Sequence, residues 1–292
     1  MASIHEIMAL RGENFDSDSE IQTQEVSDDT SDVDHERKRQ RTATQVVADK
    51  TTTSSTEDKF HLAKLDSVRD CGEFLDDEEF IAQRGAARDR AAPQYSQVLR
   101  SIIQDLPSFD RLVMYQEDDF VIILDGFPKS RYHFLVIPHT KSLLCVDNID
   151  ELVNRERERG GIRALLEKLH ALSREFAAEL EKRTMCKFVC GFHSVPSCQP
   201  LHYHVLSYDL DGAKMNKKDH WNSFTREDFF VSAERVLAVM KEERARLDIC
   251  RDKRENVMMK LRCPTCEIEL DSFKKMKSHR TNCKSMRPVF KL

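Results

Sequence analysis

The chain has 292 residues, of which 40% are hydrophobic and 33% are charged, and its formal net charge is -5. This composition is typical of a soluble protein long enough to form a core of its own, and no apolar run approaches the roughly 20 residues that a membrane helix needs. We therefore expect no membrane span. Because the first residues lack a basic start followed by an apolar stretch, we also expect no secretory signal, and the nine cysteines should be mostly reduced.

Charge is distributed unevenly along the chain. Residues 1–58 carry 6 basic and 14 acidic side chains, a net charge of -8, whereas residues 212–292 carry 20 basic and 12 acidic side chains, a net charge of +8. A basic C-terminal third is typical of a protein with a phosphate-rich partner, although charge alone does not identify that partner.

Residues 1–58 contain the acidic run DSDSEIQTQEVSDDTSDVD and the polar run TTTSSTED, without sustained periodicity. They predict a disordered acidic tail. Its serines and threonines are candidates for phosphorylation and for docking a protein partner, and a purely solubilising tail is the alternative. A basic cluster in the same segment predicts a nuclear import signal, and so a nuclear protein; its members are Arg37, Lys38, Arg39 and Arg41.

The predicted structured elements begin near Phe60, and residues 59–240 form the first expected domain. Helical spacing predicts helices from about Asp76 to Ala91, over PQYSQVLRSII, over GIRALLEKLHALSREFAAELEKR, and from Thr225 to about Lys241. Five runs predict strands: RLVMYQED, FVIILDG, RYHFLVIP, CKFVCGFHS and LHYHVLSYD. Strands, then a long helix, then strands indicate an α+β fold with an antiparallel sheet.

Residues 241–292 form a second expected domain, a basic linker followed by a small metal-binding module. Cys263 and Cys266 are separated by two residues, and His279 and Cys283 by three, which is the ligand spacing of a compact zinc finger with a final cysteine. The sequence therefore predicts a structural Zn²⁺ site. Basic residues on the expected helix of this finger favour contact with nucleic-acid phosphates, and a purely structural or protein-binding finger is the alternative.

Two histidines one residue apart, His202 and His204, lie in a strand-like run. Side chains alternate along a strand, so both rings should face the same side of the sheet. Two imidazoles together can divide nucleophilic and acid–base work at phosphorus, whereas a metal site would need a third ligand that the sequence does not place beside them. A merely structural pair is the alternative.

Phosphate-binding residue types surround this pair in the sequence. HSVPS places His193 and Ser197 upstream, FPKSRYH places Lys129, Arg131 and His133 in a turn and strand, and NKKDHWNSF follows with further lysines. Arginine, lysine and histidine side chains of this kind favour a phosphate ester or anhydride as the ligand. The structural alternative for His133 is a histidine of the hydrophobic core. The structural alternative for Arg131 is an ion pair with a nearby acidic turn.

At these motifs the sequence resembles the aprataxin family of DNA-adenylate hydrolases in the histidine-triad (HIT) superfamily. The resemblance covers roughly Tyr95 to Leu292 and includes DGFPKSRYHFLVIP, GFHSVPS, LHYHVLS, NKKDHWNSF and the C-terminal finger, in that order. It implies a HIT antiparallel sheet with helices followed by a zinc finger. It also implies a DNA repair hydrolase that removes AMP from adenylated 5′ DNA ends and leaves 5′-phosphate DNA.

The resemblance further implies a chemistry that needs no metal. His202 falls on the central histidine of the family motif and would attack the α-phosphorus to form a covalent AMP–histidine intermediate, while His204 would stabilise the phosphoryl oxygens and His193 would assist at the phosphate or leaving group. The substrate- and DNA-binding positions carried over are Tyr95, Leu99, Ile102, Leu124, Asp125, Gly126, Phe127, Pro128, Lys129, Arg131, Ser197, Cys198 and Lys218.

Two departures from the family pattern matter. The motif usually begins with a further histidine that supports the nucleophile, and here that position is Pro200, which lacks an imidazole's hydrogen bonds. The N-terminal segment carries the acidic tail in place of the phosphopeptide-binding domain of vertebrate relatives. A general nucleotide phosphoramidate or dinucleoside polyphosphate hydrolase, and a non-enzymatic zinc-finger nucleic-acid adaptor, are therefore the alternatives.

Overall fold

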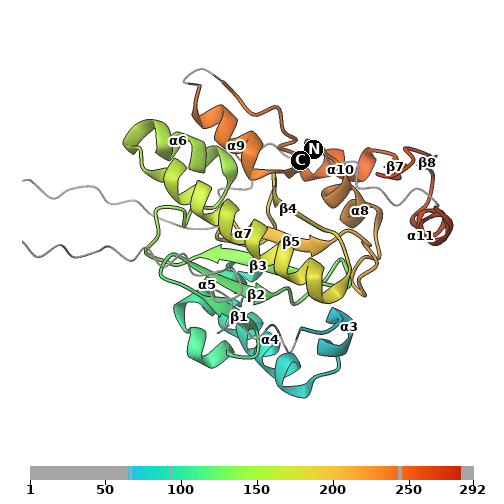
Figure 1. The fold of residues 1–292 in the computed structure, drawn as a ribbon, viewed down its shortest axis with the longest axis horizontal. Helices are drawn as coiled ribbons and strands as arrows, with labels where there is room; N and C mark the ends of the chain where they lie inside the picture. The colour runs from blue at the N-terminus through green and yellow to red at the C-terminus, as the bar shows by residue number, and fades with distance from the viewer. Residues whose placement is uncertain (1–64, 66–67, 93, 243–244, 284–292) are drawn as a thin grey trace, which may run out of the picture. The chain divides into compact units, whose positions relative to one another are not determined.

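The computed structural model describes residue 65 and residues 68–92, 94–242 and 245–283 (Figure 1). The predicted acidic tail, its phosphorylation sites and the basic import cluster lie outside these ranges. Among the helices in them, none is both long enough and apolar enough to cross a membrane.

The centre of the fold is a six-stranded sheet in which all the paired strands are antiparallel, with the order β1-β2-β3-β5-β4-β6. Its strands are β1 (Val113–Gln116), β2 (Phe120–Leu124), β3 (His133–Pro138), β4 (Phe188–His193), β5 (Tyr203–Ser207) and β6 (Phe230–Val231). The five predicted strands are confirmed, and with them the α+β class. The connection from β3 to β4 carries two helices, α6 (Ile149–Arg159) and α7 (Ile162–Thr184), so β5 can insert between β3 and β4.

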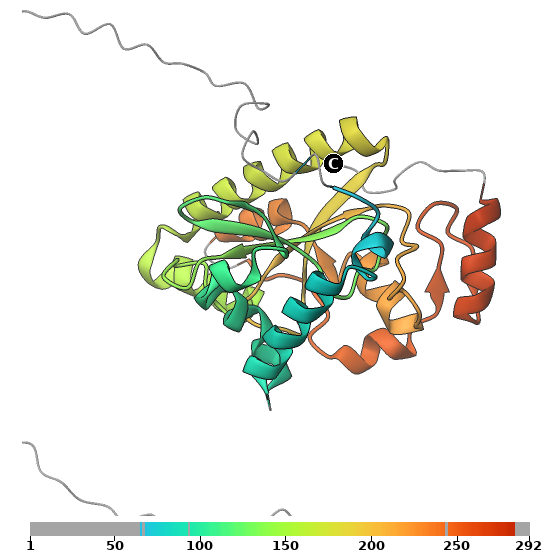
Figure 2. The same ribbon diagram turned by 90° about the horizontal axis from the view of Figure 1, so that it is seen from below.

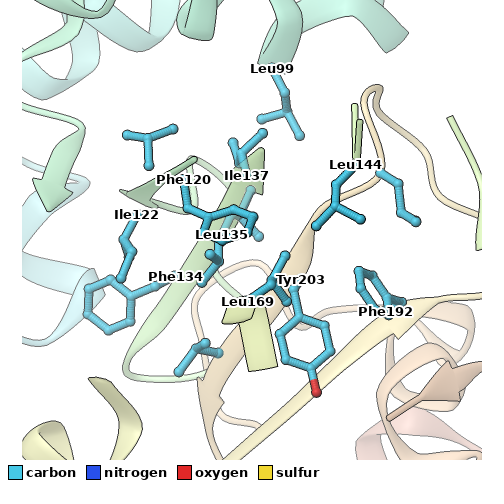
Figure 3. Packing of buried hydrophobic residues seen from close by; sticks show 14 of the residues in the cluster. Leu99, Phe120, Ile122, Phe134, Leu135, Ile137, Leu144, Leu169, Phe192 and Tyr203 are labelled. Atoms are coloured by element: carbon cyan, nitrogen blue, oxygen red, sulfur yellow. The ribbon is translucent and has the colours of Figure 1, made fainter. Parts of the chain in front are cut away.

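The two faces of the sheet have different roles, which follow from the alternation of side chains along each strand. Phe134 on β3 packs its ring 5.3 Å from that of Phe176 on α7, and α7 crosses the strands on that face (Figure 1). The next residue, Leu135, faces the opposite side and pairs in register with His204 on β5. Buried side chains of this core are drawn in Figure 3. The face opposite α7 is therefore the one on which His204 lies.

The remaining helices form on capped and amphipathic segments at the edges of the sheet. Asp77 accepts from the N–H of Phe80 and begins the helix predicted from about Asp76 to Ala91, while the predicted segment PQYSQVLRSII forms a 3₁₀ turn followed by a helix. These elements are α3 (Cys71–Phe74), α4 (Glu78–Ala91), η2 (Tyr95–Gln97), α5 (Val98–Gln104) and η3 (Leu106–Phe109). Both predicted helices are confirmed in place, with one of them beginning as 3₁₀.

The helix predicted from Thr225 to about Lys241 is wrong in its first half. Phe230 and Val231 form β6 and pair with β4, and the helix that follows, α9 (Ala233–Met240), begins only after Ser232 caps it. Aromatic and β-branched side chains favour a strand, and here an unpaired edge of β4 is available to them. The tertiary partner outweighs the local helical spacing.

The C-terminal region joins the sheet through α8 (Lys218–Thr225) and α10 (Lys253–Met258). Trp221 of α8 is 1% exposed and donates its indole N–H to the carbonyl of Arg262 in β7 (Leu261–Arg262). β7 pairs with β8 (Glu269–Leu270), and β8 lies beside α11 (Phe273–Asn282) (Figure 2). A second hydrophobic cluster runs from Leu206 on β5 to Met276 on α11, so the finger shares a core with the face of β5 on which His204 lies.

Candidate active site

Three strands bring histidines together on the face of the sheet opposite α7. The ring of His204 on β5 lies 4.4 Å from that of His193 on β4, 4.8 Å from that of His202 and 5.2 Å from that of His133 on β3, measured between centroids. His202 precedes β5 by one residue, and its ring still lies beside that of His204, on the same side as predicted. The sequence interpretation of His133 as a core residue is incomplete, because this ring is only 1% exposed and yet lines the site.

His202 is held by the backbone of the residue that departs from the family motif. Its Nδ1 lies 3.0 Å from the carbonyl oxygen of Pro200, which can only accept, so Nδ1 carries the hydrogen. In a neutral ring the lone pair is then on Nε2. Proline lacks an N–H and an imidazole, but it keeps its carbonyl, so the support for this orientation of His202 is present.

Hydrogen bonds also link His204 to the turn before β3. The backbone N–H of Lys129 donates to Nδ1 of His133 at 3.1 Å, and Nε2 of His133 lies 3.0 Å from Nδ1 of His204. The carboxylate of Asp125 lies 3.4 Å from the same Nδ1 of His133. Asp125, His133 and His204 have donor atoms close enough together to hold a metal ion, but the nitrogens that face each other between the two rings already share a hydrogen bond.

Burial keeps these rings neutral. It lowers the pKa of His202 and, more strongly, the pKa values of His193 and His204, while His133 falls to a pKa of about 4. For Asp125, burial acts to raise the pKa, but the nearby His133 and Lys129 outweigh it and the pKa is lowered. The site thus combines neutral imidazoles with a carboxylate at neutral pH.

The histidines open into a cavity of about 420 Å³ that is lined by both apolar and polar residues. Its aliphatic lining residues are Val98, Leu99, Ile102, Leu112, Ile123, Leu124 and Leu135. The residues of the turn after β2 and of the loop after β4 also line it, namely Asp125, Gly126, Phe127, Lys129, Ser197 and Cys198. Tyr95 belongs to the lining as well, is 44% exposed, and has its ring 6.3 Å from that of Phe127.

Three predicted site residues lie elsewhere. Arg131 pairs its Nε with Asp70 at 2.8 Å and is not part of the cavity lining. Pro128 contributes its carbonyl to the N–H of Lys214, and Lys218 begins α8 outside the cavity lining. The neighbouring Lys217, one residue earlier, lines the cavity instead.

The lining of the cavity is more basic than the sequence predicted. Arg84 and Arg88, one helical turn apart on α4, line it together with Lys214, Lys217 and Lys253. Arg88 lies 5.7 Å from the centre of the Tyr95 ring, and Lys253 on α10 places its ammonium 3.3 Å from the hydroxyl of Ser197. The i, i+4 spacing of Arg84 and Arg88 was a signal in the sequence, whereas Lys253 is 56 residues from Ser197 and could be placed only by the fold.

The four predicted metal ligands converge. The ligand atoms of Cys263, Cys266, His279 and Cys283 all lie within 4.8 Å of one another. The sulfurs of Cys263 and Cys283 are 4.0 Å apart, close to the roughly 3.8 Å of a tetrahedral site with metal–sulfur bonds of about 2.3 Å. Burial favours the neutral thiol of Cys263, but backbone N–H groups of Cys266 and Thr265 outweigh it and lower the pKa to about 6. This Cys₃His group fits a structural metal ion.

This fold and histidine-bearing face resemble those of known proteins. Residues 97–220 match the family described as scavenger mRNA decapping enzyme C-term binding. Aprataxin from Gallus gallus is 32% identical over 185 residues, which are 63% of this chain and 54% of that protein. An aprataxin-like protein from Saccharomyces cerevisiae is 30% identical over 142 residues, 42% of this chain and 65% of that protein.

Solved structures agree on the fold. The crystal structure of the aprataxin ortholog Hnt3 in complex with DNA superposes with a TM-score of 0.52 at 24% identity, covering 65% of this chain and 94% of that one. The chain is thus similar to aprataxins from several animals. It spans about half the length of the first curated relatives it matches.

Proposed function

We propose that this protein is a DNA-5′-adenylate hydrolase that releases AMP from adenylated 5′ ends. One observation carries the proposal: a neutral His202, anchored through Nδ1 to the Pro200 carbonyl, lines a cavity together with aliphatic, polar and basic residues. The aliphatic residues suit a nucleoside base, the polar residues a phosphate, and the basic residues the backbone of a nucleic acid. The crystal structure of the aprataxin ortholog Hnt3 in complex with DNA supports the same partner.

The proposed reaction has two displacements at the α-phosphorus. Nε2 of His202 forms a bond to phosphorus, the phosphoanhydride P–O bond breaks, and the 5′-phosphate of the DNA leaves with the electron pair. Water then forms the new P–O bond, the P–N bond breaks, and AMP leaves while the electron pair returns to Nε2. His204 and His193 lie where they can donate to phosphoryl oxygens, and Lys129 supplies positive charge beside the turn at Asp125.

The finger would hold Zn²⁺ in this proposal and add to the DNA footprint. Zinc suits a Cys₃His donor set, and when bound it would fix the two halves of the finger relative to each other. Residues on α11 and the linker add positive charge, including Lys274, Lys275 and Lys277. A site of action in the nucleus and a phosphorylation-dependent protein partner for the acidic tail are further parts of the proposal, based on the sequence of residues 1–58.

The test is AMP release from a nicked duplex with an adenylated 5′ end. Wild type should convert it to 5′-phosphate DNA, and His202→Ala should lower the rate by at least about 10³-fold, as removal of a nucleophile does. DNA binding by both proteins without turnover would instead support the adaptor alternative. Faster turnover of a dinucleoside polyphosphate or of AMP–lysine than of adenylated DNA would support the general nucleotide hydrolase, which does not need so many basic residues around the cavity.

A further inference from the structure

His133 lies outside the predicted catalytic residues, yet its ring is 1% exposed and contacts His204 directly. The contact joins Nε2 of His133 to Nδ1 of His204 at 3.0 Å, so one of these two nitrogens carries the hydrogen and the other accepts it. Which of them donates decides whether His204 offers a donor or a lone pair to a bound phosphate. The direction of this hydrogen bond is therefore a functional property of the site.

The turn before β3 settles the direction. The backbone N–H of Lys129 can only donate, and it points at Nδ1 of His133 at 3.1 Å, so this nitrogen is the acceptor. A neutral imidazole has one N–H, so the hydrogen of His133 lies on Nε2 and is donated to Nδ1 of His204. The Asp125 carboxylate is 3.4 Å from Nδ1 of His133, farther than the amide nitrogen, and its Oδ1 accepts from the N–H of Phe127 at 2.6 Å.

The same reasoning identifies the tautomer of His204. With Nδ1 of His204 accepting, the hydrogen of this neutral ring lies on Nε2. Within the part of the chain that the structure describes, Nε2 of His204 is buried and has no hydrogen-bond partner, and the residue lines the cavity. A buried N–H without an acceptor is costly, by about 1–3 kcal/mol, so it is suited to an acceptor that arrives with the substrate.

We propose that His133 is a positioning residue that holds His204 as a donor toward the phosphate. Donation from Nε2 of His133 fixes both the tautomer and the ring orientation of His204, so that its Nε2–H meets a phosphoryl oxygen as negative charge develops there. The chain runs from the Lys129 amide through His133 and His204 to the substrate. This inference rests on the proposed function for its catalytic part, but not for the hydrogen-bond direction.

The first experiment locates the hydrogen in the substrate-free full chain. Histidine labelled with ¹⁵N allows the tautomer of each ring to be identified from its two nitrogen shifts, and a scalar coupling across the N–H···N bond identifies the donor. We expect the hydrogen on Nε2 of both His133 and His204. A hydrogen on Nδ1 of His204 overturns the proposal, whether or not the protein releases AMP from any substrate.

The second experiment measures the consequence. His133→Phe keeps a ring but removes the donor, and we expect kcat for AMP release to fall about tenfold with KM little changed, less than the roughly 10²- to 10³-fold loss on deleting a donor to developing charge. The matched control is Cys71→Ala. The Cys71 sulfur accepts from the backbone N–H of His133, so this substitution removes a contact to the same residue but keeps the hydrogen bond between the rings of His133 and His204. An unchanged kcat in His133→Phe, or an equal fall in Cys71→Ala, overturns the proposal.

Discussion

At the scale of single residues, the histidines of the proposed site could be predicted from the sequence but their support could not. The family motif identified His202 and His204, and alternation along a strand placed them on one face, as the ring separation of 4.8 Å confirms. Pro200 supports His202 through its backbone carbonyl. Every residue has such a carbonyl, so the identity of the side chain at this position could not predict the contact. His133 was equally obscure, because its partner lies on another strand, 71 residues away.

The buried histidines should make the proposed activity tolerant of mild acid. Burial lowers the pKa of His202 below the ordinary 6.5 or so, and the nucleophile must be unprotonated, so activity is present above the lowered pKa and lost as the pH falls through it. We expect the acid limb of kcat/KM for AMP release to have its midpoint below about pH 6.5. A midpoint above that value would mean that His202 is more solvated, or more favourably paired when charged, than its burial indicates.

At the scale of elements, strand and helix identity followed from periodicity, whereas the packing of loops did not. The turn from Pro128 to Ser130 is held by a second loop, in which Gly212 donates to the carbonyl of Lys129 and Lys214 to that of Pro128. Neither loop has a periodic pattern, so this pairing could not be predicted. The helix expected from Thr225 failed for a related reason, since the edge of β4 decides the state of Phe230 and Val231.

Adding a methyl group at Gly212 should disturb the turn from Pro128 to Ser130. A Cβ there would lie 2.5 Å from the carbonyl carbon of Lys129 and 2.5 Å from the amide nitrogen of Ser130, both of them backbone atoms. We expect Gly212→Ala to destabilise the fold by about 1–3 kcal/mol in denaturant unfolding and to lower AMP release.

Gly85→Ala is the control, because no atom lies within 4 Å of a Cβ added there. Gly85 lies in the middle of α4, where alanine should stabilise the fold by about 0.5–1 kcal/mol. Equal stability of the two variants would contradict the close approach.

α10 should contribute to the choice of substrate through Lys253. Its ammonium lies at the cavity beside Ser197, so Lys253→Gln should reduce kcat/KM for adenylated DNA by about tenfold, the value of one charged hydrogen bond of about 1.5 kcal/mol. AMP–lysine, which has no DNA strand, should be affected less. Arg254→Gln removes the same charge from the next residue, which does not line the cavity, and serves as the control. Equal losses from the two variants would show that the effect comes from the overall charge of the protein and not from the position of Lys253.

At the scale of the whole molecule, the spacing of cysteines predicted the metal module, but its attachment to the sheet emerges only in three dimensions. Trp221 bonds to the carbonyl of Arg262, and Arg280 of α11 donates to the carbonyl of Tyr208 just after β5. The apolar cluster from Leu206 to Met276 continues the same contact. These long-range contacts bring the basic C-terminal third onto the same body as the cavity.

Removing the metal should therefore affect DNA more than a small substrate. Cys266 is the exposed ligand among the four, so Cys266→Ser removes a ligand with the least disturbance of the shared core. We expect the Kd for adenylated nicked DNA to rise about tenfold or more, with a shallower salt dependence, while hydrolysis of AMP–lysine changes little. An equal loss on both substrates would show that the finger only supports the fold.

The central claim is that His202 becomes covalently adenylated, and trapping that species tests it most directly. After brief reaction with nicked DNA that carries a radiolabelled adenylate and quenching in alkali, the account predicts a label on the protein that is acid-labile, as a phosphorus–nitrogen bond to histidine is, and that maps to the peptide containing His202. The label should be absent from His202→Ala. It should accumulate when hydrolysis of the AMP–histidine intermediate, the second step, is slowed. A label that persists in His202→Ala, or AMP release at the wild-type rate by that variant, would contradict the account.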